Sequence, residues 1–167
     1  MSFIDELKHA HENEKKRLEE ERAVAHQKVL EECSTEVHEV IRKDSMSKAK
    51  TGRTHAEGYV ATNRYDFGLR SYEKPPVVGR RDSEDNFTWN DGGECSAITP
   101  NGEFCDKVIV MVSDSLRKDG FVNFTLSRCP CYQKKKVRRK HFLSPDTTEL
   151  IDTNNFLGYI IQYSVSW

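Results

Sequence analysis

The sequence predicts an α+β protein, in which a long N-terminal α-helix is followed by a small, largely antiparallel β-sheet domain with a short helix. Three observations lead to this prediction. Residues 2–45 contain neither glycine nor proline, whereas glycine interrupts residues 45–94 repeatedly. Residues 95–167 hold 31 apolar residues, against 15 in residues 1–44, so only this part is dense enough to form a sheet core. We therefore expect a charged amphipathic helix over 1–46, a loop-rich aromatic connection over 47–94 and a β-rich core domain over 95–167.

The first element is predicted to be one continuous helix, because Glu, Lys, Arg, Leu and Ala dominate it. Ser2 is a suitable N-cap, and Asp5 follows three residues later, as in a capping box. The first half is almost entirely charged. Opposite charges three or four residues apart, such as Glu12 and Lys16, favour a helix exposed to solvent.

The second half of this helix carries an apolar stripe at helical spacing, which we interpret as a partner-binding surface. Its members are Val29, Cys33, Val37 and Val40. Two other interpretations remain open: the stripe packs on the core of the same chain, or it forms a homodimer. It is not a clean coiled-coil heptad, because Glu14 and Glu21 or Arg22 fall at seam positions.

The middle segment contains aromatic residues between its glycines and prolines. They are Tyr59, Tyr65, Phe67, Tyr72, Phe87 and Trp89. They are expected to anchor a long loop to the core, and a binding surface is the alternative.

The last segment is expected to form strands. The apolar run Val108–Val112 has the length of a central strand covered on both faces. Residues 121–128 alternate between apolar and polar, as do residues 159–167, with Tyr159, Tyr163 and Trp167 on one face. Between these strands, residues 144–146 (Ser-Pro-Asp) have the N-cap, proline and acid that begin a short helix.

Composition restricts the class of partner. Charged residues make up 32% of the chain, but the net charge is only −1, so contact with nucleic acid requires a local basic patch. No run of eighteen apolar residues is present, and the first twenty residues lack the apolar core of a signal peptide. We therefore expect an intracellular, cytoplasmic protein with no membrane partner.

Such a patch exists over residues 134–140, where six of seven residues are basic. They are Lys134, Lys135, Lys136, Arg138, Arg139 and Lys140. This cluster can neutralise phosphates, and the flanking Tyr132, His141 and Phe142 can stack on bases. Three other interpretations are a lysine-rich edge strand, an intramolecular partner for the acidic helix, and a nuclear-localisation signal.

Four of the five cysteines raise the question of structural zinc. These candidate ligands are Cys95, Cys105, Cys129 and Cys131. Zinc ligands usually occur in pairs two to four residues apart, whereas these pairs are separated by nine residues and by one. A hairpin with a three-residue loop at Pro100–Gly102 would bring Cys95 and Cys105 to one face. A two-residue Asn-Gly loop would put the two thiols on opposite faces. We expect inert thiols and no cofactor, with structural zinc as the minority interpretation.

One short motif resembles an enzyme family. The residues His55, Ala56 and Glu57 are similar to the His-Ala-Glu element of zinc-dependent cytidine and nucleobase deaminases. The resemblance implies that His55 binds zinc and Glu57 transfers a proton, with Pro130 and Cys131 beginning the second zinc-binding element. The sequence departs from the family at Lys134, where the second cysteine of that element belongs.

Taken together, these features favour a non-catalytic binding protein of the adaptor or inhibitor type, acting on a protein or a protein–nucleic-acid assembly. A protein is the expected partner, and a homodimer is an open alternative. The second hypothesis is a nucleic-acid-binding protein that uses residues 134–140. The remote alternative is a zinc-dependent hydrolase related to the deaminases.

Overall fold

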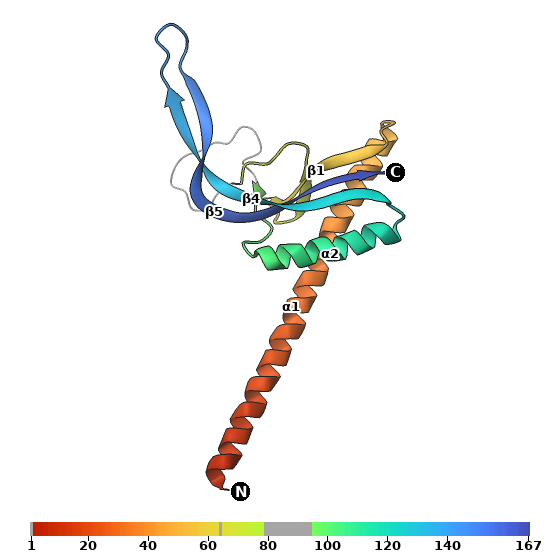
Figure 1. The fold of residues 1–167 in the computed structure, drawn as a ribbon, viewed down its shortest axis with the longest axis vertical. Helices are drawn as coiled ribbons and strands as arrows, with labels where there is room; N and C mark the ends of the chain where they lie inside the picture. The colour runs from red at the N-terminus through yellow and green to blue at the C-terminus, as the bar shows by residue number, and fades with distance from the viewer. Residues whose placement is uncertain (1, 64, 79–94) are drawn as a thin grey trace.

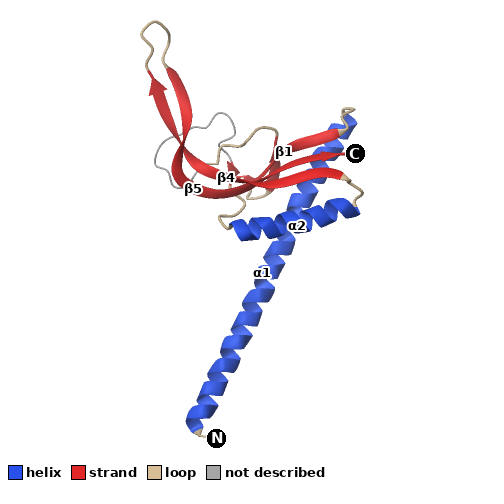
Figure 2. Ribbon diagram, viewed as in Figure 1, coloured by secondary structure: helices blue, strands red, loops and turns tan. Residues whose placement is uncertain are grey.

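The computed structural model describes residues 2–63, 65–78 and 95–167, and it confirms the predicted α+β class. Two helices and five strands follow one another within these ranges; Figure 2 shows their arrangement. They are α1 (Phe3–Lys50), β1 (His55–Asn63), β2 (Leu69–Tyr72), β3 (Cys95–Ser96), α2 (Gly102–Lys118), β4 (Asn123–Arg139) and β5 (Thr147–Ser166). No helix within these ranges combines the length and hydrophobicity needed to cross a membrane.

Helix α1 begins at the predicted N-cap, and only its second half packs on the rest of the domain. The Ser2 side chain accepts a hydrogen bond from the Asp5 backbone, and the Asp5 side chain accepts one from the Ser2 backbone, which completes the capping box. Its buried residues all lie in the second half, beginning at Leu30, and residues 2–29 are exposed. The helix therefore projects far beyond the domain (Figure 1).

The five strands form one sheet in the order β2-β1-β5-β4, with the short β3 also paired to β1. All pairings between named strands are antiparallel. The expected C-terminal strand is present as β5, which lies between β1 and β4 and reaches Ser166. Among the described strands, β4 lies at one edge of the sheet. Because the basic segment 134–140 lies largely on β4, its position agrees with the interpretation as a lysine-rich edge strand.

Both helices cover one face of the sheet (Figures 1 and 2). The main core lies between them and the sheet. Its fully buried members include Val37 and Ile41 from α1, Val112 from α2, and Ile161 and Tyr163 from β5. Because successive side chains of a strand point to opposite faces, Ile160 belongs to a second, smaller cluster on the other face.

The predicted central strand at Val108–Val112 is wrong, because these residues belong to α2. Cys105, Val108 and Val112 recur every three or four residues and pack inward together. The side chain of Asn101 accepts a hydrogen bond from the Phe104 backbone and caps the helix. The expected turn at Pro100–Gly102 is therefore a helix start, and no hairpin joins Cys95 to Cys105.

The short helix expected at residues 144–146 is also absent, since these residues lie in the turn between β4 and β5. The threonines that follow enter β5 directly and pair with Arg138 and Arg139 of β4. The described part of the middle segment contains the strands β1 and β2, of which β1 carries the buried Val60. Phe87 and Trp89 lie outside the described residues.

Candidate functional site

The structure divides the predicted helix stripe between the core and the surface. Val37 is fully buried in the main core, and Cys33 and Val40 are half-buried against it. Val29 is exposed. Of the four residues, only Val29 presents a largely exposed side chain to a partner, and Val37 serves the chain's own core.

The exposed start of α1, residues 2–25, forms what we call the helical arm. At 1.5 Å per residue it is about 36 Å long. Charged side chains along it pair with each other: Arg17 lies 2.6 Å from Glu14 and 3.6 Å from Glu21. Exposed apolar side chains also lie on the arm, among them Phe3, Ile4 and Leu7 near its start. A largely charged helix held by such ion pairs can stay folded in water and act as a spacer between binding units.

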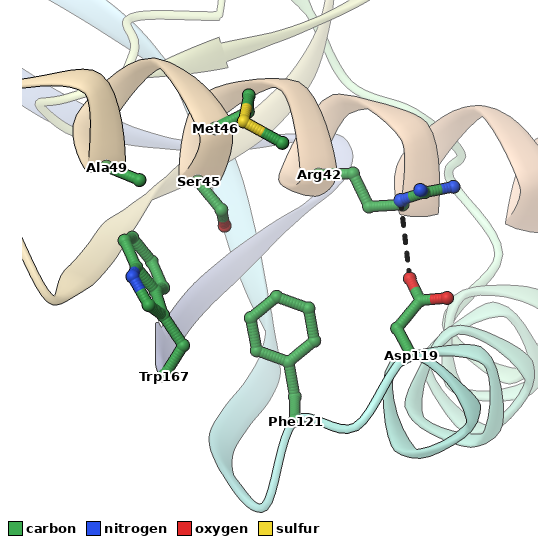
Figure 3. A pocket seen from close by; sticks show the side chains of 7 residues that line it. All are labelled: Arg42, Ser45, Met46, Ala49, Asp119, Phe121 and Trp167. Atoms are coloured by element: carbon green, nitrogen blue, oxygen red, sulfur yellow. Dashed lines mark ion pairs between the residues drawn. The ribbon is translucent and has the colours of Figure 1, made fainter.

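A cleft lies where the second half of α1 meets the end of the sheet (Figure 3). Its volume is about 310 Å³. Its walls are Arg42, Ser45, Met46 and Ala49 from α1, Asp119 and Phe121 after α2, and the terminal Trp167. The Ser45 hydroxyl is buried and points toward the two aromatic rings, and it has no hydrogen-bond partner among the described residues. This combination of Trp, Phe, Met and Arg is enriched in the centres of protein interfaces.

One end of the cleft is charged. Asp119 accepts a contact of 2.7 Å from His38 Nε2 and one of 3.4 Å from Arg42 Nε, the latter drawn in Figure 3. These contacts tie the end of α2 to α1. They also hold the Arg42 side chain at the rim of the cleft, where a partner's carboxylate or carbonyl oxygen can reach it.

The predicted basic segment lies on an extension of β4 and β5 that we call the hairpin arm, residues 132–156. It projects beyond the other strands, at the opposite end of the molecule from the N-terminus (Figure 1). Lys134, Lys135, Lys136, Arg138 and Arg139 lie on its β4 strand, and Lys140 follows at the turn. The basic segment is therefore held away from the acidic first half of α1.

The arm leaves the sheet at irregularities in the β4–β5 register. These occur between Cys131 and Tyr132 and between Tyr132 and Lys134. An inserted residue bends a strand and increases its twist, which explains why the arm turns away from the sheet in Figure 1. Gln133 braces the bend, because its backbone oxygen accepts a 2.6 Å hydrogen bond from Thr153 and its side chain accepts one of 2.7 Å from Asn155.

Aromatic rings line the base of the arm. The Tyr132 ring lies edge-on to that of Phe156, with centroids 5.8 Å apart, and Phe156 lies 5.0 Å from Tyr159. Tyr132, predicted to stack on bases, is thus partly used in packing and remains 39% exposed. His141 contacts Thr147 through its ring nitrogen at 2.9 Å across the turn.

The positive charge of the arm is reduced by its second strand. The arm contains six basic residues, all within 134–140, and three acids, Asp146, Glu149 and Asp152, so its net charge is +3 with histidine neutral. Arg139 Nε lies 2.9 Å from a carboxylate oxygen of Glu149. Such an exposed pair is worth little energy and exchanges readily for a phosphate contact.

The four candidate zinc ligands are distributed over both faces of the sheet. Cys95 and Cys131 belong to the smaller cluster, whereas Cys105 belongs to the main core. Burial raises the pKa of Cys95 to about 12 and that of Cys105 to about 12, so both thiols hold their protons. Within the described part of the chain, no three His, Cys, Asp or Glu side chains are grouped as a metal site.

The two halves of the deaminase-like motif lie apart. His55 and Glu57 are on β1, opposite Ser166 and Ser164 of β5, whereas Pro130 pairs with Tyr159 of the same strand. The seven residue steps from Tyr159 to Ser166 span about 23 Å at 3.3 Å per step. One ion cannot bridge this distance, so the geometry gives no support to the resemblance.

Sequence reasoning missed the cleft, because its walls come from three distant parts of the chain. Phe121 and Trp167 were expected only as members of strands. A signal was available in Ala49, which continues the helix past its expected end at residue 46. No protein-family model, curated protein or solved structure matches this chain.

Proposed function

We propose that this protein is a non-catalytic binding protein of the adaptor type, which connects a protein partner to a second, anionic partner. The observation that carries the proposal is the placement of two charged projections, the helical arm and the hairpin arm, at opposite ends of one small domain (Figure 1). Neither arm is needed to cover the main core. Folded, exposed elements that the core does not require are therefore candidate contact surfaces for other molecules.

A protein partner is favoured on the α1 side of the molecule. The helical arm offers mixed charge, and the cleft offers Met46, Phe121 and Trp167, the residue types that dominate interface energetics. A second copy of this chain is disfavoured as the occupant of the arm. In a parallel dimer Glu14 and Glu21 would each face their own copies across the seam.

The experiment compares three forms of the chain as baits in cells of the source organism. They are the whole chain, a variant lacking residues 2–25, and the cleft variant Trp167→Ala. Proteins that the whole chain retains in high salt are then purified and their binding is measured directly. We expect a purified partner whose affinity falls at least about tenfold on removal of the arm or of the Trp167 side chain. Equal affinity for all three forms would contradict the proposal.

Oligomeric state provides an independent check. Sedimentation velocity of the purified whole chain is expected to give the mass of one chain, 19.3 kDa, over a wide range of concentration. A stable dimer that becomes monomeric when residues 2–25 are removed would assign the arm to self-association.

The second candidate function is nucleic-acid binding through the hairpin arm. The specific observation in its favour is that six basic residues lie on or beside a projecting two-stranded ribbon. Each phosphate contact releases a counterion, so affinity for a duplex should fall steeply as salt rises.

Salt dependence tests this candidate with a matched pair of variants. The first replaces Lys135, Lys136, Arg138 and Lys140 by glutamine; the control replaces Lys8, Lys15, Lys28 and Lys43, so both have the same net charge. We expect the first variant to reduce the slope of log affinity against log salt by about three for a duplex. The control should keep the slope of the whole chain, and equal slopes in all three proteins would exclude the candidate.

A further inference from the structure

The tip of the hairpin arm carries two adjacent large apolar side chains that are almost completely exposed. Phe142 is 100% exposed and Leu143 is 95% exposed. They lie in the turn between β4 and β5, the part of the arm farthest from the sheet (Figure 1). Each costs free energy in water, and together they sit where a partner is reached first.

We propose that the hairpin arm lies along a groove of a double-stranded nucleic acid and inserts Phe142 and Leu143 against the base pairs as a wedge. The inference rests on the second candidate function and names its ligand and its mode of contact. A two-stranded ribbon fits a groove of the duplex, and the positive charge of residues 134–140 would neutralise phosphates on the borders of that groove. Apolar side chains that enter between base steps unstack them in part and bend the duplex.

The choice of a duplex over a lipid surface follows from the distribution of charge. From Lys134 to Lys140 the basic residues extend over about 20 Å of strand. A membrane entered by the tip would attract only the charges near the tip, because attraction is screened beyond about 8 Å at physiological salt. A duplex that lies alongside the arm brings phosphates to the whole length of the basic segment.

The choice of a duplex over a single strand follows from the chemistry of the tip. Proteins that hold single strands present aromatic faces in succession, on which consecutive bases stack. Here the tip pairs Phe142 with Leu143, which has no π-face but the bulk of a wedge. The neighbouring His141 ring contacts Thr147 across the turn. The aromatic rings at the base of the arm, Tyr132 and Phe156, are packed edge to face against each other.

The test uses a short mixed-sequence duplex with fluorophores at both ends, so that energy transfer reports bending. Binding and bending are measured for the whole chain, for Phe142→Ser combined with Leu143→Ser, and for the control Val122→Ser. Val122 is also highly exposed but lies at the start of the β4 region, away from the tip. Because all three side chains are exposed, the variants should melt as the whole chain does.

We expect the tip variant to lose the bend and about tenfold in affinity while keeping the salt slope, and Val122→Ser to change neither. Unchanged bending and affinity in the tip variant would overturn the wedge. Tighter binding to a single strand, or to vesicles of anionic lipid, would overturn the choice of a duplex. If neutralising Lys135, Lys136, Arg138 and Lys140 leaves duplex binding unaltered, the nucleic-acid function itself fails, which distinguishes the two failures.

Discussion

The hydroxyl group of Tyr163 connects several elements of the fold. It donates a 2.6 Å hydrogen bond to Asp44 of α1 and contacts the Ser71 hydroxyl of β2. Asp44 also lies 3.2 Å from Lys48, whose ammonium group donates to the Glu57 carbonyl of β1. This network fixes the second half of α1 against the sheet and so determines the direction in which the helical arm projects.

Tyr163→Phe is therefore expected to lower the free energy of unfolding by about 1–3 kcal/mol, because Asp44 loses a donor in a largely buried site. Urea unfolding measures the change. The control is Tyr65→Phe, since Tyr65 is exposed in the turn after β1. A loss no larger than that of the control would show that the network contributes nothing to stability.

Stability at alkaline pH depends on the buried thiols. The pKa of Cys95 and that of Cys105 are each raised from 9.0 to about 12, first of all by burial. Their contribution is complete below pH 9 and is lost as pH rises through 12, because only the unfolded chain releases these protons in between. Each thiol steepens the fall by up to about 1.4 kcal/mol per pH unit.

Urea unfolding between pH 8 and pH 11 measures this fall, and Cys105→Ala is expected to make it shallower. The variant also loses packing, which shifts the whole curve without changing its slope. An unchanged slope in Cys105→Ala would mean that the thiol ionises equally well in the folded chain.

For single residues, the sequence predicts which side chains face the core but not which side chains they contact there. The alternation of residues 159–167 correctly places Tyr163 in the core. It cannot indicate Asp44, because their contact joins positions 119 residues apart. The same limit applies to Asp119, whose partners His38 and Arg42 lie on another helix.

Among the elements, α1 combines a core helix with an exposed arm. One valine in each part allows their contributions to stability to be compared. Val37 is 0% exposed and Val24 is 70% exposed on the same helix. Val37→Asp is expected to cost about 3–5 kcal/mol, because it buries an unpaired charge. Thermal or urea unfolding should show Val24→Asp within about 0.5 kcal/mol of the whole chain. Similar losses in both variants would place the arm inside the cooperative unit.

Strand β5 is the element on which the sheet depends, since it pairs with both β1 and β4. Deleting Gln162–Trp167 removes the fully buried Tyr163 and Val165, and we expect cooperative melting to disappear. Deleting residues 2–25, which are exposed, should leave the melting transition intact. Calorimetry of both truncated chains tests the two predictions. A cooperative transition in the chain without Gln162–Trp167 would contradict the central position of β5 in the sheet.

The elements also show where the apolar pattern of the sequence fails to predict the secondary structure. A continuous apolar run has no period, so Val108–Val112 fits a buried strand and a buried helix equally well. The flanking residues distinguish the helix from the strand, because Cys105 and Leu116 extend the helical spacing and Asn101 supplies the N-cap. In contrast, the long helix was predictable because residues 2–45 lack glycine and proline and are rich in helix formers. The terminal strand was predictable because residues 159–167 alternate between apolar and polar.

On the scale of the whole molecule, the small domain holds two different projections in a fixed relation. The sequence identifies the charge of both segments. It does not predict that residues 134–140 extend away from the domain, because the bend arises from the β4–β5 register around Tyr132. Nor does it predict the cleft, whose aromatic walls, Phe121 and Trp167, meet α1 only after folding. An adaptor needs this arrangement, since two partners must bind without blocking each other.

The measurement that tests this account most directly is native mass spectrometry of the untagged chain, isolated from its source cells without chelator. The whole chain is compared with the variant lacking residues 2–25 and with the variant neutralised at Lys135, Lys136, Arg138 and Lys140. We predict a metal-free complex with a protein partner that the first variant loses, and bound nucleic acid at low salt that the second variant loses. A single chain of 19.3 kDa in all three samples, or one zinc ion on every chain, would contradict the account.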